Sequence, residues 1–313
     1  MLFRSDNMSL LQSAFTLNYG WDLQSLMYGV VNRGDSPQFF NDYVSTQGSL
    51  PAGTASMHFI TNHDENSWNG TEFERYGAAV DAMAVLTYTL PGVPLIYNGQ
   101  EIGLRRRLAF FEKDAIDWNG GIPRAIYPRL NALKASNSAL DVGANPGKFL
   151  AFDTSTNAVL AFARFRGSDR VVVVLNGTAS TTNGVVTAGG LAGMYRNAVT
   201  NTLVKLRPQT YLPLAGWGYR VLTSDLAGGK TVVPTKLTAS RLKISLRTGQ
   251  STRIAPVFTP REVTDTYLRW SSSAPKVVTV SSTGTLTAVG RGTARVVSRA
   301  TNGVNLVISV TVR

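Results

Sequence analysis

The chain has 313 residues, 43% of them hydrophobic, and a formal net charge of +12 at pH 7. This length is enough for two or three domains with their own cores. The absence of cysteine excludes disulfides and thiolate metal sites, two histidines exclude a histidine-rich metal centre, and no window holds the roughly 18 consecutive apolar residues of a membrane span.

The N-terminal part alternates short apolar runs with segments of helical periodicity. Pro91 and Gly92 end the second of these helical segments. This alternating order predicts that the strands pair in parallel. We predict strands at 14–17, 59–64 and 95–97, and helices at 21–31, 75–90 and 123–136.

From Phe149 the pattern changes to short β-type runs separated by turn residues, as in 159–165 and 171–177. We predict an antiparallel β-domain that ends near Leu222. Residues 227–234 have the composition of a linker, and a unit of about 80 residues follows it.

Two segments of the N-terminal part end in polar or ionisable residues. One is the run that ends in Asn62, His63 and Asp64, and the other is 92–101, which ends in Glu101. Buried parallel strands deliver side chains in this way to the C-terminal rim of an α/β barrel. Asn-His-Asp alone is equally typical of a polar turn or a helix cap.

Together the two segments resemble the α-amylase family of glycoside hydrolases, whose seventh barrel strand ends in Asn-His-Asp and whose eighth reads Gly-Val-Pro-Leu-Ile-Tyr-x-Gly-Gln-Glu. Residues 14–23 look like the family's sixth strand and 127–133 like its last barrel helix. The resemblance covers roughly 1–222. It implies a multidomain α/β plus all-β chain, with the last three strands of a partial (β/α)8 barrel in 1–145 and an antiparallel β-sandwich in 146–225.

The segment 270–280, followed by 284–290 and 292–294, resembles the bacterial immunoglobulin-like group 2 domains. We therefore expect a third domain, 226–313, to be an immunoglobulin-like β-sandwich with a spacer or adhesion role. This domain carries 13 lysines and arginines against Glu262 and Asp265, which is +11 of the net charge. Its cations are scattered without aromatic interleaving, so we expect no nucleic-acid partner and consider the cell envelope instead.

The family resemblance also assigns roles to residues. It implies that Asp64 is the catalytic carboxylate that stabilises the transition state, and that Asn62 and His63 bind the sugar. A retaining glycosidase needs two further carboxyl groups, a nucleophile and an acid/base. No Gly-Phe-Arg-x-Asp-like string precedes Asn62, and the position of the acid reads Phe3-Arg4-Ser5. The family's calcium lies near a domain that this chain lacks, so we assign no metal or cofactor here, and calcium would belong to a longer parent.

Other polar and aromatic residues have simpler interpretations. We expect Glu72 and Glu74 to cap a helix or face solvent, and Glu101 to be a non-catalytic rim residue. The run 105–107 of three arginines predicts a solvated loop. Core packing is favoured over sugar stacking for five aromatic residues, namely Tyr19, Trp21, Trp68, Tyr97 and Trp118.

The leading hypothesis is the C-terminal portion of a secreted bacterial α-amylase-type enzyme that acts on α-glucans (starch, glycogen or maltooligosaccharides) with retention, inactive as this chain alone. The parent is expected outside the cell or at its surface, although 1–6 carry no signal peptide pattern. A non-catalytic carbohydrate-binding or surface-attachment protein is the alternative, and a remnant of a truncated reading frame is a third. The sequence does not determine which glucan is cut or whether the parent mainly hydrolyses it or transfers it to another sugar. It does not determine the oligomeric state either.

Overall fold

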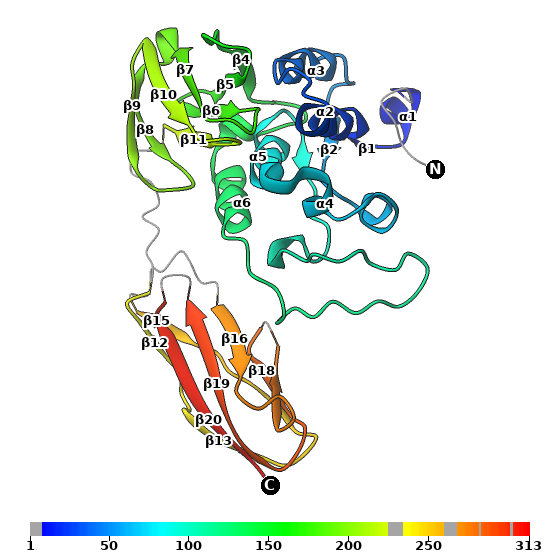
Figure 1. Ribbon diagram of the computed structural model, residues 1–313, viewed down its shortest axis with the longest axis vertical. Helices are drawn as coiled ribbons and strands as arrows, with labels where there is room; N and C mark the ends of the chain where they lie inside the picture. Colours follow the sequence, from blue (N-terminus) through cyan, green and yellow to red (C-terminus); the bar gives the residue numbers. More distant parts are fainter. Residues whose placement is uncertain (1–7, 225–233, 260–267, 282, 301–302) are drawn as a thin grey trace. The chain divides into compact units, whose positions relative to one another are not determined.

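The computed structural model describes residues 8–224, 234–259, 268–281, 283–300 and 303–313 (Figure 1). The chain divides into two compact units, one formed by 1–114 with 126–226 and the other by 115–125 with 227–313. The segment Phe3-Arg4-Ser5, most of the expected linker, and Glu262 and Asp265 lie outside the described residues. Within the described part of the chain, no helix combines the length and the apolar character needed to cross a bilayer.

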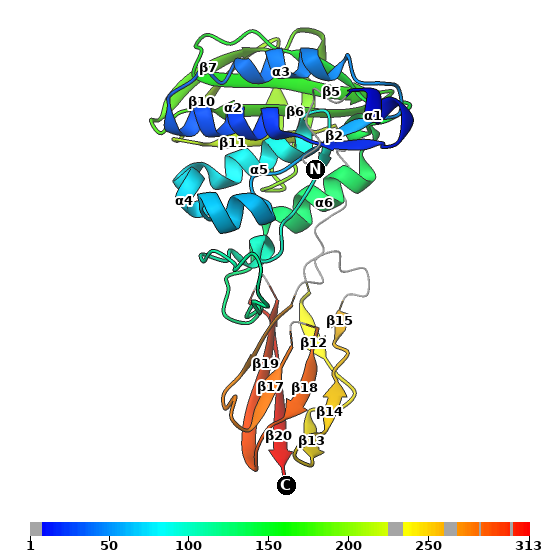
Figure 2. The same ribbon diagram turned by 90° about the vertical axis from the view of Figure 1, so that its right-hand side faces the viewer.

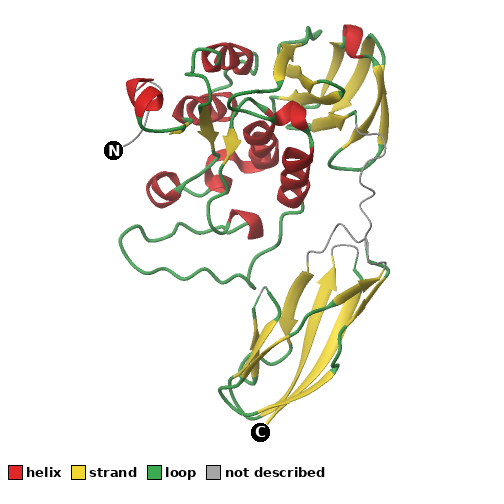
Figure 3. Cartoon of the chain, turned by 180° about the vertical axis from the view of Figure 1, so that it is seen from behind, coloured by secondary structure: helices red, strands yellow, loops and turns green. Residues whose placement is uncertain are grey.

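The first unit contains a three-stranded parallel sheet in the order β1-β2-β3, with helices packed around it (Figures 1 and 3). The strands are β1 (Leu17–Tyr19), β2 (Ala55–His58) and β3 (Val93–Pro94). The predicted parallel pairing is therefore confirmed. The predicted strand limits are wrong, because β2 ends four residues before Asn62 and β3 ends before Leu95.

The helices are α1 (Met8–Ser13), α2 (Trp21–Asn32), α3 (Phe39–Gln47), α4 (Glu72–Tyr76), α5 (Val80–Thr89) and α6 (Ile126–Ser136). The single helix predicted over 75–90 is wrong. Gly77 has a φ of 50°, which an α-helix does not accommodate, and a short 3-10 turn (Gly77–Ala79) separates α4 from α5. Residues Ala82 to Thr89 of α5 are all buried, so this helix forms the centre of the unit.

An antiparallel β-region follows. Six strands form one sheet in the order β4-β5-β6-β11-β8-β9, and β10 pairs with β7. The predicted runs 159–165 and 171–177 are strands β5 and β6. The bounds are β4 (Lys148–Ala151), β5 (Val159–Arg166), β6 (Asp169–Asn176), β7 (Thr182–Thr187), β8 (Gly193–Asn197), β9 (Leu203–Leu206), β10 (Gln209–Leu214) and β11 (Tyr219–Thr223).

Strand β5 is buried on both faces, which explains its unbroken apolar sequence. Leu160 and Phe162 belong to the core formed with the helices, whereas Val159, Ala161 and Ala163 belong to a second core within the β-region. The helical part and the β-region of this unit therefore share one hydrophobic core.

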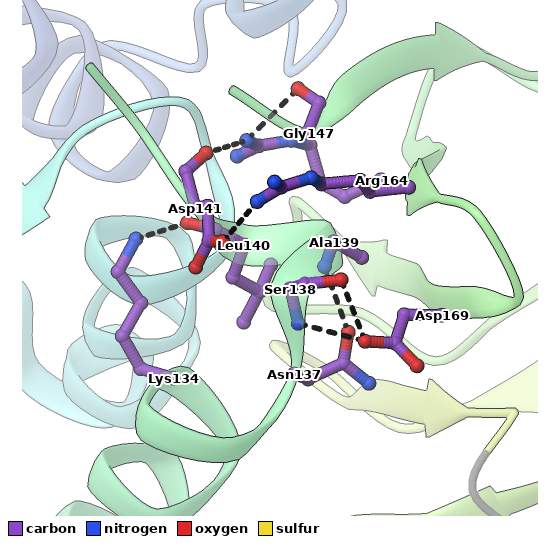
Figure 4. Close-up of polar contacts among 10 residues, drawn as sticks. Lys134, Asn137, Ser138, Ala139, Leu140, Asp141, Gly147, Arg164 and Asp169 are labelled. Carbon is purple, nitrogen blue, oxygen red and sulfur yellow. Dashed lines mark hydrogen bonds and ion pairs between the residues drawn. The ribbon is translucent and has the colours of Figure 1, made fainter. Parts of the chain in front are cut away.

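Buried cations fasten the same junction (Figure 4). The Arg164 guanidinium donates to the carbonyl oxygens of Thr89, Asp141 and Gly147 at 3.1–3.2 Å. Lys134 Nζ donates to the carbonyls of Gly92 at 2.8 Å and Leu140 at 2.6 Å. Burial lowers the pKa of Arg164 to about 10 and that of Lys134 to about 8. Because each cation bonds carbonyls from separate segments, it ties those segments together.

The second unit is built from short strands in three sheets, ordered β12-β15, β13-β20-β19-β16 and β14-β18-β17 (Figure 2). Trp270 is 4% exposed at its core. The bounds are β12 (Lys236–Thr238), β13 (Lys243–Leu246), β14 (Ser251–Arg253), β15 (Val257–Thr259), β16 (Leu268–Ser272), β17 (Val278–Val280), β18 (Thr285–Ala288), β19 (Gly292–Ala300) and β20 (Asn305–Val312).

Candidate functional site

The segment that follows β2 carries Asn62, His63 and Asp64 and leads into a π-helix, η1 (Glu65–Asn69). It lies beyond the C-terminal end of β2, at the edge where parallel strands deliver functional side chains. Short π-helices are rare and are frequent at functional sites. The sequence pattern did not predict this π-helix.

Asn62 is 1% exposed, and its Oδ1 accepts a hydrogen bond from the Glu65 backbone N–H at 2.8 Å. This is the helix-capping geometry that the Asn-His-Asp pattern left open. Asn62 therefore fixes the turn that presents the next two residues. Direct sugar binding by Asn62 stays a prediction.

His63 and Asp64 point their side chains toward solvent, with 52% and 28% of the side chains exposed. His63 Nε2 lies 3.5 Å from Asp64 Oδ1. An accessible carboxylate beside an imidazole offers both acceptors and a donor to the hydroxyl groups of a ligand. These two residues are the ones in the Asn-His-Asp segment that a ligand can reach.

Glu65 is held inside the protein, directly after Asp64. Its Oε2 lies 2.6 Å from Arg75 Nη1 and accepts from Gln24 Nε2 at 3.0 Å, and its Oε1 accepts from Asn69 Nδ2 at 3.0 Å. The Arg75 guanidinium also lies over the Tyr28 ring. With its oxygens bonded in this way, Glu65 acts as an anchor for the π-helix and not as an exposed acid.

Three other glutamates follow the Asn-His-Asp segment, Glu72, Glu74 and Glu101, and they differ in burial and bonding. Glu74 completes a capping box with Thr71 at the start of α4, as expected, and its side-chain bond to Arg107, followed by the bonds to Thr71, lowers its pKa to about 2. Glu72 is 2% exposed, so the expectation that it faces solvent is wrong. Glu101 is half-buried in a 3-10 turn (Gln100–Ile102).

The loop from Leu104 to Asp114 is tied to the π-helix. Asn66 Oδ1 accepts from the Leu108 backbone N–H, and Ser67 Oγ donates to the Leu108 carbonyl, both at 2.7 Å. The three arginines at 105–107 are exposed as predicted, yet each has a partner. Arg105 lies 3.9 Å over the Phe73 ring, Arg106 pairs with Asp114 at 2.6 Å and Arg107 with Glu74 at 3.1 Å.

This anchoring brings three exposed aromatic side chains together, Trp68, Phe110 and Phe111, which we call the aromatic cluster. Their exposed fractions are 57%, 38% and 84%. Ring centroids lie 5.3 Å apart for Trp68–Phe110 and 4.8 Å for Phe110–Phe111, and the His63 ring is 5.9 Å from Phe110. The cluster is therefore continuous with the accessible His63 and Asp64.

The prediction that Trp68 packs in the core is wrong, because the π-helix turns its side chain outward. Trp118 is also exposed, at 38%. Tyr19 and Trp21 do pack, with ring centroids 5.9 Å and 4.9 Å from the buried Phe59. Sequence reasoning did not identify Phe110 and Phe111 as site residues, although two adjacent phenylalanines in a charged loop are a signal for an exposed apolar surface.

Among the residues that the structure describes, no three His, Asp or Glu side chains gather where they would hold a metal ion.

Residues 231–312 match the family described as bacterial Ig-like domain (group 2). The remaining part is similar to α-amylases. The α-amylase MalA of Haloarcula japonica is 31% identical over 159 residues, which are 48% of this chain and 23% of that protein.

Solved structures agree at the level of fold. A noncanonic maltogenic α-amylase, AmyB of Thermotoga neapolitana, superposes with a TM-score of 0.59 and 17% identity over 70% of this chain and 53% of its own. The structure of AmyP in complex with maltose has a TM-score of 0.50 and 14% identity over 68% of this chain and 50% of its own. The chain thus spans about a quarter of the curated relative and about half of these structures. One part of the chain is similar to α-amylases and another matches the bacterial Ig-like model, as the sequence resemblance indicated.

Proposed function

We propose that this chain supplies the α-glucan-binding edge of an α-amylase-type glycoside hydrolase. The observation that carries the proposal is the continuity of Asp64, His63 and the aromatic cluster on one accessible surface. Aromatic faces stack on sugar rings, while a carboxylate and an imidazole bond sugar hydroxyls. An AmyP structure that shares the fold contains maltose, which supports an α-linked glucose oligomer as the ligand.

In the proposed reaction Asp64 stabilises positive charge as it develops at the sugar carbon during a retaining hydrolysis. His63 holds the sugar in place, and Asn62 keeps the turn in position through its bond to Glu65. Of the described carboxylates that neighbour Asp64 in the sequence, Glu65 is bonded as an anchor, Glu74 is a cap and Glu72 is buried, so we propose that none of these three substitutes for the nucleophile and the acid. We therefore propose that the chain alone binds glucan but does not hydrolyse it.

We further propose that the parallel sheet is the last part of a (β/α)8 barrel. Among the strands that the structure describes, β1 is at the edge of the sheet, and its Leu17 is 39% exposed. Unpaired sheet edges with apolar side chains invite further strands. The strands that carry the two missing carboxylates would pair there.

A second proposed role is attachment, because the Ig-like unit is strongly basic. In this role the protein works outside the cell or at its surface, and the basic unit contacts the cell envelope. Glucan binding and attachment are compatible, since they use different units of the chain.

Starch sedimentation combined with reducing-sugar release tests the glucan proposal. The 313-residue chain should sediment with granular starch, remain in solution with cellulose and release no reducing sugar. Trp68→Ala should lose the sedimentation, whereas Trp118→Ala, a tryptophan outside the aromatic cluster, should keep it. Sugar release by the wild type that disappears in Asp64→Asn would overturn the claim that the chain is inactive alone.

A further inference from the structure

The four-stranded sheet β13-β20-β19-β16 of the second unit has one buried and one exposed face. Along β19, Ala294, Val296, Ser298 and Ala300 are buried, whereas Arg295 and Arg299 between them are exposed. Strand alternation places these two arginines on the same face, four residues or roughly 13 Å apart.

The register of the sheet adds two cations to the same face. Arg269 of β16 is directly opposite Arg299. Lys243 of β13 is opposite Ser309 of β20, and Ser309 is opposite Arg295. We call these four residues, Lys243, Arg269, Arg295 and Arg299, the basic face. With neighbouring strands about 4.8 Å apart, they cover a patch of roughly 13 by 14 Å.

The described residues after 233 offer no side-chain carboxylate that would neutralise the basic face. Residues 234–259, 268–281, 283–300 and 303–313 contain eleven exposed lysines and arginines and no aspartate or glutamate. Two arginines directly opposite each other on neighbouring strands repel and destabilise a sheet. The opposed arginines therefore do not stabilise the fold. A polyanion bound across the strands would be stabilised by their charges.

The rest of the face indicates which polyanion fits. Ser271 and Ser309 lie between or beside the cations and are exposed, so hydroxyl groups are available to a polyol or sugar backbone. Among the described residues, the face has no exposed aromatic ring on which bases would stack and no large exposed apolar side chain that would enter a lipid layer. This combination favours phosphodiester polymers with a polyol backbone over nucleic acids and membranes.

We propose that the basic face binds an anionic phosphodiester polymer with a polyol or sugar backbone, of the kind exposed on a cell surface. This inference rests on the proposed attachment role and gives it a site and a ligand chemistry. The contacts are charge-assisted bonds from the guanidinium and ammonium groups to phosphate oxygens. Binding therefore weakens as salt concentration rises.

The test uses the full chain and poly(glycerol phosphate) as the probe. A triple variant of the basic face, R269T/R295T/R299T, should bind at least tenfold more weakly and with a shallower dependence on salt. A matched triple variant, K236T/R253T/K276T, removes the same charge from β12, β14 and the turn before β17. It should keep most of the affinity, because its cations lie outside the four-stranded sheet.

Two further measurements keep the outcome interpretable. R269K/R295K/R299K retains the charge and should retain binding, which shows that the charge at these positions, and not the arginine side chains as such, is required. Starch sedimentation should be unchanged in all three variants, so failure of this inference is distinguishable from failure of the glucan proposal. Equal losses in both threonine triples, or tighter binding to single-stranded DNA or anionic vesicles than to poly(glycerol phosphate), would overturn the inference.

Discussion

Glu65 Oε2 and Arg75 Nη1 lie 2.6 Å apart, with 8% and 12% of their side chains exposed. This pair joins the π-helix to the end of α4 and therefore holds the residues on either side of Glu65. On one side it fixes Asp64 and on the other Asn66 and Trp68. The accessible surface of the candidate site depends on this buried pair.

Arg75→Met should lower the free energy of unfolding of the first unit by about 3 kcal/mol or more, because a buried carboxylate then loses its partner. Urea unfolding followed by circular dichroism measures the effect. Arg33→Met is a matched control, since the Arg33–Asp35 pair is short, at 2.7 Å, but largely exposed. Arg33→Met should lower the free energy of unfolding by less than about 1 kcal/mol. Equal stability of Arg75→Met and the wild type would contradict the anchoring role.

His58 should make the first unit less stable in acid. It is fully buried, Tyr43 Oη lies 2.9 Å from its Nε2, and burial, followed by the charge of Lys134, lowers its pKa to about 3. The unfolded chain has a histidine pKa of about 6.5, so between these values the unfolded state binds the extra proton and stability falls as pH falls. From pH 7 to 4.5 the loss due to His58 is roughly 2 to 3 kcal/mol.

Thermal unfolding of wild type and His58→Gln across pH 4.5 to 7 measures this effect. The variant is less stable at pH 7, and its melting temperature should fall less steeply toward pH 4.5. Carboxylates that titrate in this range affect both proteins alike, so the difference between the two curves isolates His58. Parallel curves would show that His58 is not buried in its neutral form.

Arg164→Met should destabilise the junction between the helices and the β-region. The three carbonyls of Thr89, Asp141 and Gly147 lose a donor, and unpaired buried acceptors cost about 1–3 kcal/mol each. We expect a loss of several kcal/mol, seen as a lower denaturation midpoint in urea. Arg166→Met is the control on the same strand, because Arg166 is partly exposed and pairs with Asp141. A smaller loss in Arg164→Met than in Arg166→Met would refute the fastening role.

Asn66→Ala should weaken glucan binding without unfolding the chain. Asn66 Oδ1 accepts the Leu108 N–H, and its loss frees the loop that carries Phe110 and Phe111. The fraction sedimented with granular starch should fall severalfold while the melting temperature changes by only a few degrees. Asn41→Ala, whose side chain bonds Gln38 beside α3, should leave sedimentation unchanged. If Asn66→Ala sediments as well as the wild type, the loop that carries Phe110 and Phe111 does not contribute to glucan binding.

Local patterns in the sequence predicted the strand and helix types well where one interaction dominates. The apolar runs of β5 and β6 identified buried strands, and the alternation of apolar runs and helical segments indicated parallel pairing. The predicted limits of helices were wrong where the φ angle of one residue interrupts a helix, as at Gly77. Helix α3 was missed because it buries only Phe40 and Tyr43, so its nine residues give a weak apolar period.

The site was predictable in part. The motif located Asn62, His63 and Asp64, but it did not distinguish the buried cap from the two accessible side chains. The aromatic cluster depends on hydrogen bonds between residues far apart in the sequence, such as Ser67 to Leu108, and on a π-helix that has no simple sequence period. Such long-range contacts become visible only in the folded chain.

Glucan binding at this surface is tested by measuring how much of the 313-residue chain sediments with granular starch, in wild type, Trp68→Ala and Asp64→Asn, with reducing sugar assayed in the same tubes. The wild type should sediment without releasing sugar, Trp68→Ala should stay in solution, and Asp64→Asn should sediment less than the wild type. Wild type that stays in solution, or a Trp68→Ala variant that sediments as well as the wild type, would contradict the assignment of this surface as the glucan-binding edge.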